Sequence, residues 1–233
     1  MIFQLDLTRF IQIYVAQFVF GCFFLCLGIK TSKKGLKGSR LILFLFVMGI
    51  FFGIIINMIY APLTDERLVW SLNAVANFLF LFSVVFLTIF CYVKLKDEQV
   101  NKPIIGALSI SYLILILLCI LLIPNNVTIN KSTNWKPVWS NEFFILTSLI
   151  LLFYGPIPTF YFGIKLLKKY EEYPDIRYRW LKILIGIFIT YLFFYGTITA
   201  NWLNVQVFRT LWVIPGAFFA VSGGWLIYRG ATK

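Results

Sequence analysis

The sequence predicts an all-α, polytopic membrane protein folded as a bundle of seven transmembrane helices. Hydrophobic residues make up 61% of the 233 residues, and the mean hydropathy is +0.88, well above that of soluble domains. The apolar residues form long continuous runs, and nearly all of the 21 Lys and Arg and 9 Asp and Glu fall in the short gaps between runs. A charge at the centre of the bilayer costs several kcal/mol, so this spacing indicates membrane-spanning helices.

Seven of the apolar runs are long enough to cross the bilayer, which needs about 20 mostly apolar residues. They lie at roughly 8–29, 41–61, 69–94, 104–123, 141–167, 179–200 and 208–229. The connections between them are short, so we expect residues 1–233 to form a single transmembrane domain. A lipid-facing sheet does not fit, because the runs are continuous instead of alternating and an exposed sheet edge is not tolerated in lipid.

The distribution of basic residues predicts the orientation of the bundle. Sixteen of the 21 Lys and Arg lie in the first, third and fifth connections and the C-terminal tail, which share one side of the membrane, and five lie on the other side. By the positive-inside rule the N-terminus is then outside and the C-terminus cytoplasmic, which requires an odd number of spans. The net charge of +12 is therefore explained by topology and by contacts with anionic lipids of the bilayer, and no nucleic-acid partner is expected.

The first run, 8–29, is predicted to be a retained helix and not a cleaved signal peptide. A signal peptide normally opens with basic residues, whereas residues 1–7 contain Asp6 and no Lys or Arg. We therefore count this run as the first of the seven spans.

Uncharged polar side chains gather in the outer halves of four runs. They are Gln12 and Gln17 in the first run, Asn57 in the second, Asn73 and Asn77 in the third, and Thr197, Thr199 and Asn201 in the sixth. Amides in lipid must find partners, so these side chains are expected to point into the bundle. Two interpretations stay open. Either the five Gln and Asn side chains of the first three runs, with Tyr60, Trp70 and Trp202 as walls, form an outward-opening pocket for a small lipophilic ligand, or they make interhelical hydrogen bonds worth about 0.6 kcal/mol each, the more common role.

The fourth connection and two of the later runs contain further local signals. The connection at 124–140 is the longest, lies outside, and carries two glycan-acceptor triplets at Asn126 and Asn130, a pattern that often arises by chance. Pro156 and Pro158 lie midway through the fifth run, and Pro215 lies in the seventh. Proline removes a helical hydrogen bond, so both runs are predicted to be kinked.

The sequence lacks the residues on which most membrane enzymes depend. It has no histidine, which excludes His-ligated haem, a Ser–His protease and His-containing metal sites. No Asp or Glu lies deep in a run, which argues against a carboxylate relay for protons or sodium. The seventh run has no internal lysine to hold a retinal, and there is no Gly-rich phosphate loop. We therefore expect no catalytic residues, no bound metal, no cofactor and no enzymatic activity.

The basic fifth connection carries a family resemblance. Lys168 and Lys169 are followed by Arg177 and Arg179, which run into the apolar sixth helix. This segment, together with seven spans, short loops and an outer N-terminus, resembles the seven-helix sensor modules at the N-termini of some prokaryotic histidine kinases. No kinase domain follows in this sequence, so the resemblance implies a sensor module that signals through another chain. Lys168, Lys169, Arg177 and Arg179 are then candidate contacts for a cytoplasmic partner or for anionic lipid.

These observations predict an integral protein of the plasma membrane, of sensor or receptor-like type, that signals through a separate cytoplasmic protein. Two other interpretations remain open. A small facilitative transporter of a neutral solute would use the same prolines for alternating access and would need a pocket near the bilayer midplane, where Tyr154, Thr190 and Tyr195 are the main polar residues. A structural subunit would pack beside a larger membrane complex.

Overall fold

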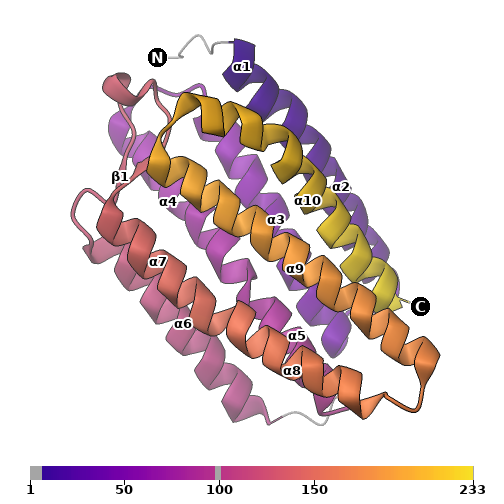
Figure 1. Ribbon diagram of the computed structural model, residues 1–233. Helices are drawn as coiled ribbons and strands as arrows, with labels where there is room; N and C mark the ends of the chain where they lie inside the picture. The colour runs from indigo at the N-terminus through magenta and orange to yellow at the C-terminus, as the bar shows by residue number, and fades with distance from the viewer. Residues whose placement is uncertain (1–6, 98–100, 233) are drawn as a thin grey trace.

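The computed structural model describes residues 7–97 and 101–232, which form an all-α bundle with seven helical segments long and apolar enough to cross a membrane (Figure 1). The segments are Ile11–Ser32, Ser39–Tyr60, Glu66–Leu95, Lys102–Leu122, Asn141–Lys169, Pro174–Leu203 and Gln206–Ala231. Each coincides with one predicted run, with ends that agree to within about five residues. The predicted fold class is confirmed. Asp6, on which the prediction of a retained first helix depended, lies outside the described residues.

The seven segments pack as a closed ring in chain order. Each contacts the next, and α10 (Gln206–Thr232) returns to lie beside α2 (Gln17–Ser32). The third segment consists of α4 (Glu66–Ser83) and α5 (Val85–Leu95), and α5 packs against both α3 (Ser39–Tyr60) and the fifth segment across the ring. This third segment is the most enclosed, with 56% of its most apolar stretch buried. It therefore lies further inside the bundle than the other six segments.

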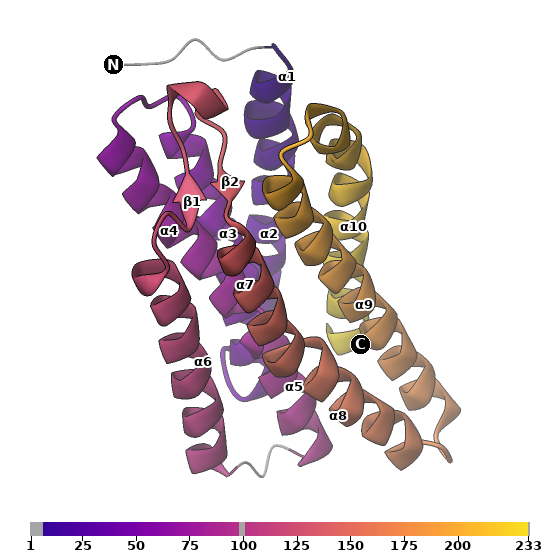
Figure 2. The ribbon, with the colours of Figure 1, turned by 60° about the vertical axis from the view of Figure 1, so that its left-hand side comes forward.

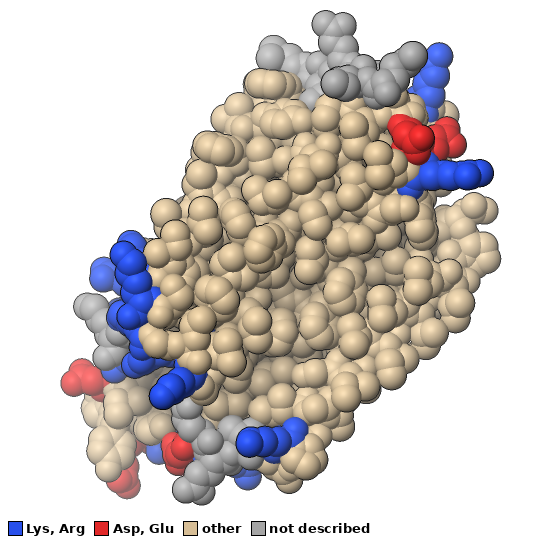
Figure 3. Space-filling view, turned by 180° about the vertical axis from the view of Figure 1, so that it is seen from behind, with Lys and Arg blue, Asp and Glu red and all other residues tan. Residues whose placement is uncertain are grey.

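The charged residues that the structure describes lie towards the two ends of the bundle. The first segment begins at one of these ends, and the last segment finishes at the opposite one (Figure 1). Seen from behind, Lys and Arg side chains gather at these ends, and a wide belt without charges separates them (Figure 3). We call the end that carries the start of α1 the N-terminal end, and the opposite one the lysine-rich end. The uncharged belt is the surface that lipid chains would cover.

The first segment is not a regular α-helix over its whole length. After the short α1 (Leu7–Phe10), the chain forms a π-helical stretch, η1 (Ile11–Ala16), and then continues as α2. The sequence predicts one uninterrupted helix here, because hydrophobic periodicity does not distinguish π from α geometry over so few residues. A π-helical turn widens the helix and re-aims its side chains, and such turns are frequent at functional sites.

A small β-hairpin covers part of the N-terminal end (Figure 2). It follows α6 (Lys102–Leu122) and consists of β1 (Val127–Thr128) and β2 (Val138–Trp139), which pair antiparallel, with the 3-10 turn η2 (Lys131–Thr133) between them. This is the longest of the predicted connections, and the sequence analysis did not predict strands in it.

Both predicted glycan-acceptor residues of this connection serve structural roles. Asn126 is buried, and its side chain donates to the Ile120 carbonyl (2.6 Å) and accepts from Trp70 Nε1 (3.3 Å) and its neighbour's backbone N–H. Asn130 caps η2 by accepting from the backbone N–H groups of Ser132 and Thr133. A glycan on Asn126 is incompatible with this folded arrangement, because the amide nitrogen that would carry it is buried and bonded.

The fifth segment is broken where the prolines predict a kink. Its two halves, α7 (Asn141–Tyr154) and α8 (Pro156–Lys169), meet at Gly155. Pro158 has no N–H for the Tyr154 carbonyl, and Thr88 Oγ1 from α5 donates to that carbonyl instead (2.7 Å). The Thr88 hydroxyl also lies 2.7 Å from Thr159 Oγ1, which lies 2.9 Å from the Tyr191 hydroxyl. A neighbouring helix therefore satisfies the backbone that proline leaves open.

The last two segments, α9 (Pro174–Leu203) and α10, form the closest helix pair of the bundle. A Cβ atom added to Gly223 of α10 would come within 2.5 Å of Thr190 Oγ1 and 2.9 Å of the Gly186 carbonyl on α9. Only glycine allows backbones to approach this closely, as is common in membrane helix pairs. The predicted Pro215 lies inside α10, towards the N-terminal end from this contact.

Candidate functional site

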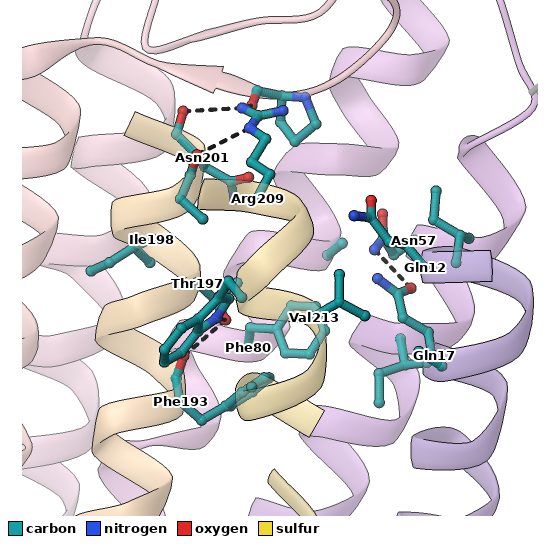
Figure 4. Close-up of a pocket in the computed structure, with 18 of the residues that line it drawn as sticks. Gln12, Gln17, Asn57, Phe80, Phe193, Thr197, Ile198, Asn201, Arg209 and Val213 are labelled. Carbon is teal, nitrogen blue, oxygen red and sulfur yellow. Dashed lines mark hydrogen bonds between the residues drawn. The ribbon is translucent and has the colours of Figure 1, made fainter. Parts of the chain in front are cut away.

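A cavity of about 250 Å³ lies between five of the seven segments, in the N-terminal half of the bundle (Figure 4). Its walls come from η1 and α2, α3, α4, α9 and α10, and the loop before β2 closes one side. This space is large enough for several water molecules or a small organic molecule. The sequence analysis placed a pocket between the first, second, third and sixth spans, and α10 of the seventh is an additional wall.

The five predicted Gln and Asn side chains all line this cavity. The π-helical stretch presents Gln12, and the first turn of α2 presents Gln17, which accepts a hydrogen bond from Asn57 Nδ2 on α3 (2.9 Å). On α4, Asn73 and Asn77 are one helical turn apart and therefore share a face. Asn77 Nδ2 donates to Asn73 Oδ1 (2.9 Å), and Asn73 Nδ2 donates to the Tyr60 hydroxyl (2.8 Å).

Two of these hydrogen bonds, Asn57 to Gln17 and Asn73 to Tyr60, join neighbouring helices, as the structural interpretation of the amides predicts. The amides nevertheless leave a space open between them. Figure 4 shows Gln17 and Asn57 on one wall and Thr197 and Arg209 on the opposite wall. Within the described part of the chain, the Gln12 side chain has no hydrogen-bond partner. The cluster therefore keeps donors and acceptors available to a bound molecule.

Trp70 and Trp202, both predicted as walls, are not among the described residues that line the cavity. The Trp70 indole N–H donates to Asn126 beneath the hairpin (3.3 Å). That of Trp202 donates to Asn141 Oδ1 (2.7 Å), and its ring stacks on Phe144 at a centroid distance of 4.3 Å. Both indoles thus find partners elsewhere at the N-terminal end. The predicted Tyr60 does line the cavity.

Two other tryptophans occupy the wall positions. Trp139 of β2 and Trp212 of α10 both line the cavity, and the Trp212 indole N–H donates to Thr197 Oγ1 (3.3 Å). A Cβ atom on Gly196 would lie within 2.0 Å of the Trp212 ring, so this glycine makes room for the indole. The sequence analysis did not assign either tryptophan to the pocket, because the sequence carries no signal for the direction in which an indole points.

Cationic side chains surround the mouth of the cavity. Arg9 is buried and donates to the carbonyls of Asn134 (2.7 Å) and Trp135 (2.5 Å). Arg209 of α10 donates to the carbonyls of Pro137 (2.6 Å), Ala200 (3.0 Å) and Asn201 (3.3 Å). Lys136, whose Nζ donates to Gln206 Oε1 (3.0 Å), lies in the loop that the two arginines hold. The sequence analysis assigned all three cations to topology alone.

The interior of the cavity is apolar. Its wall there consists of aliphatic and aromatic side chains with small residues of α10: Phe20, Phe24, Ile50, Ile54, Phe80, Leu81, Phe193, Phe194, Val213, Gly216, Ala217 and Ala220. A largely apolar hollow with a few convergent polar groups is the usual composition of a small-molecule site. Among residues 7–97 and 101–232, no group of three or more His, Cys, Asp or Glu side chains could hold a metal ion.

The predicted partner-contact residues lie at the lysine-rich end, far from the cavity. Lys168 and Arg177 are exposed, and Arg179 is half-buried at the start of α9. Lys169 is the exception, since its Nζ forms an ion pair with Asp97 Oδ2 (2.5 Å) and donates to the Leu95 carbonyl (3.2 Å). A second hollow of about 240 Å³ at this end is bordered by four further cations, Lys34, Lys37, Arg40 and Lys94.

These features define the class of the protein: it is a multi-pass integral membrane protein with seven helices able to span the bilayer and a largely apolar cavity, with a few polar groups, near one end. No protein-family model matches the chain, and no curated protein sequence is significantly similar to it.

Proposed function

We propose that the protein is a receptor-like sensor that binds a small ligand in the cavity of the N-terminal half. The observation that supports this proposal best is the cavity itself, in which polar groups of five segments converge on a space that side chains leave open. Interhelical hydrogen bonding alone would not require an open space, because packed interiors rarely contain voids of this size. The protein acts by binding and not by catalysis.

The orientation of the protein follows from the positive-inside rule. The lysine-rich end faces the cytoplasm, so the cavity is in the outer half of the membrane and receives its ligand from outside or from the outer leaflet. The plasma membrane is the location in which such a sensor meets an external signal.

The helix α9 connects the cavity to the proposed cytoplasmic surface. It runs without a break through Pro174–Leu203, with Thr197 and Asn201 at the cavity and Arg177 and Arg179 at its other end. The close contact at Gly186 and Gly223 couples it to α10, whose cavity-lining residues begin at Gln206, continue past Pro215 and end at Ala220, one helical turn from that contact. A ligand that displaces the outer half of α10 would therefore shift α9 and the basic segment that follows α8.

The polar residues near the bilayer midplane support the transporter interpretation less than the cavity supports the receptor-like one. The Tyr154 hydroxyl donates to Ser111 Oγ (3.2 Å), the Tyr195 hydroxyl to the Ser148 carbonyl (3.2 Å), and Thr190 Oγ1 to the Gly186 carbonyl (2.8 Å). All three polar groups are thus occupied by protein partners, and the described cavity lining does not include them. A substrate path through the midplane would need such groups to face it.

The coupling of cavity and cytoplasmic surface can be tested by photo-crosslinking in cells. A photoreactive residue at Arg177 should capture one specific soluble protein, and the yield should change when Ala217→Phe fills the cavity. Ala107→Phe on the exposed face of α6 is the matched control and should leave the yield unchanged. Capture of lipid alone, or a yield that does not respond to Ala217→Phe, would contradict the proposed signalling role.

A further inference from the structure

The carboxamides in the cavity wall are only partly used by the protein itself. Asn57 Nδ2 donates to Gln17 Oε1 (2.9 Å), but within the described residues Gln17 Nε2 and Asn57 Oδ1 make no hydrogen bond. Asn77 donates to Asn73 through Nδ2, and no donor in the described part of the chain reaches its Oδ1. With the unpartnered side chain of Gln12, the wall therefore offers both donors and acceptors to a bound molecule.

Three of these carboxamides lie close together. The hydrogen bond between Gln17 and Asn57 brings their two amide groups side by side, and Figure 4 shows Gln12 next to them. The free Nε2 donor of Gln17 therefore lies near the free Oδ1 acceptor of Asn57. A carboxamide on a ligand carries the matching pair of groups, an acceptor carbonyl and a donor N–H, and can bond to both at once.

The charge distribution around the cavity disfavours a charged ligand group at these amides. Arg9 and Arg209 donate to backbone carbonyls of the loop before β2, so their role is to hold that loop. Among the described lining residues, no Asp or Glu provides a counter-charge for a cation. A carboxylate, in turn, has no proton to donate to the free oxygens of Asn57 and Asn77. An uncharged group that both donates and accepts avoids both costs.

The cavity lining becomes apolar from the amides towards the lysine-rich end. Phe24 follows Gln17 by seven residues on α2, and Ile50 precedes Asn57 by seven residues on α3. Seven residues make about two helical turns, so each apolar side chain shares a face with its amide. Because α2 and α3 run in opposite directions, both apolar side chains lie on the lysine-rich side of the amides, where Ala220 of α10 lines the same space. This part of the cavity suits an apolar chain.

We propose that the ligand is a neutral amphiphile, with a carboxamide head at Gln12, Gln17 and Asn57 and an apolar chain that extends between α2, α3 and α10 towards the lysine-rich end. This inference rests on the proposed function and specifies the ligand class of the same cavity. A neutral amphiphile partitions into the membrane, so it can reach the cavity from the outer leaflet.

The test uses the full chain in phosphatidylcholine nanodiscs and three photoreactive probes, each with a diazirine near the chain end: N-methyldecanamide, methyl decanoate and decanoate. The amide and the ester have nearly the same shape, but only the amide has an N–H. At equal concentration in the membrane, the amide probe should label cavity residues, found by mass spectrometry of the digested protein. The ester and the carboxylate should each label them about tenfold less, as expected for loss of one well-formed hydrogen bond.

Asn57→Leu is the diagnostic variant, because it removes the acceptor for the N–H that only the amide probe has. It should reduce labelling by the amide about tenfold and leave labelling by the ester unchanged, which also shows that the cavity is still formed. Gln12→Met should lower labelling by the amide as well, and it removes no hydrogen bond found within the described residues. Thr199→Val, which removes a hydroxyl at the same end of the bundle but outside the described lining, should change neither.

The outcomes separate this inference from the proposed function. Equal labelling of the cavity by the amide and the ester would overturn the carboxamide head but keep the ligand site. Stronger labelling by decanoate than by the amide would show that a charged head is preferred and would overturn the neutral ligand. Labelling confined to the lipid-facing surface with all three probes would remove the ligand site itself, and with it the proposed function.

Discussion

Two polar clusters lie inside the bundle, and they differ in how completely the protein satisfies them. At the break between α7 and α8, the buried Thr88 donates to the Tyr154 carbonyl. Its hydroxyl lies 2.7 Å from that of Thr159, which lies 2.9 Å from the hydroxyl of Tyr191, and both of these residues are also buried. In the N-terminal half, the amides on η1, α2, α3 and α4 surround a space of about 250 Å³. We call these the closed cluster and the open cluster.

The comparison separates two uses of polarity within a membrane protein. The closed cluster supplies the Tyr154 carbonyl with the donor that Pro158 lacks, and each hydroxyl of the cluster has a partner within the protein. The open cluster makes hydrogen bonds between helices, from Asn57 to Gln17 and from Asn73 to Tyr60, but it also leaves donors and acceptors that can bind a molecule in the cavity. If the distinction is correct, substitutions in the closed cluster lower the stability of the protein without affecting ligand binding. Substitutions in the open cluster weaken ligand binding and change the stability little.

The largest loss of stability is expected from Thr88→Val. This change keeps the shape of the side chain but leaves the Tyr154 carbonyl without its donor, which should lower the free energy of unfolding by about 1–3 kcal/mol. Unfolding by sodium dodecyl sulfate in mixed micelles measures it. Thr199→Val is the control, since no hydrogen bond is found for its hydroxyl within the described residues, and it should stay within about 0.5 kcal/mol.

Tyr191→Phe should have a smaller effect on the same cluster. It removes the hydroxyl that lies 2.9 Å from Thr159 Oγ1 but leaves the Thr88 bond to the carbonyl intact, so we expect a loss of about 1 kcal/mol. The same unfolding assay applies. A loss as large as that of Thr88→Val would mean that the cluster acts as one unit and that our division of its roles is wrong.

Asn77→Leu should show the opposite behaviour in the open cluster. Its amide gives one hydrogen bond to Asn73, so the free energy of unfolding should fall by only about 0.6 kcal/mol. Binding of a cavity ligand, measured by native mass spectrometry of the protein released from its own membrane, should nevertheless be lost. Unchanged binding together with a large loss of stability would assign the open cluster to structure alone.

The smallest effect on stability is expected at the lysine-rich end. Arg177→Gln changes an exposed side chain, so the free energy of unfolding should stay within about 0.5 kcal/mol of the unsubstituted protein. Under the proposed signalling role, recovery of the proposed cytoplasmic partner by affinity purification should nevertheless fall. Lys33→Gln, an exposed change in the first connection, is the comparison and should keep both quantities unchanged.

Much of the fold could be predicted because the bilayer imposes a simple rule on charge. All seven segments were located from the absence of charge over about 20 residues, and the kink in the fifth from its prolines. The inward direction of the amides was also predictable, since lipid offers them no partner. The π-helical stretch at Ile11–Ala16 and the hairpin at 127–139 were not, because both depend on contacts with distant segments.

The residues that line the cavity could be predicted only in part, because the sequence of one apolar segment does not show how that segment packs against the others. Trp70 and Trp202 were expected as walls from their position along the membrane normal, but the rotation of a helix about its axis decides which way an indole points. Arg9 and Arg209 looked like ordinary end-of-helix charges. Both donate hydrogen bonds to carbonyls of the loop around Lys136, and this becomes visible only when the fold brings the first and last segments together.

The most direct test of the central claim is native mass spectrometry of the protein released from its own membrane, with Ala217→Phe and Ala107→Phe as a pair. If the open cluster holds a ligand, the unsubstituted protein and Ala107→Phe should retain a bound molecule that Ala217→Phe lacks, at equal thermal stability of the two variants. An identical set of bound molecules in both variants would contradict the account, because the cavity would then hold nothing that a phenylalanine ring can displace.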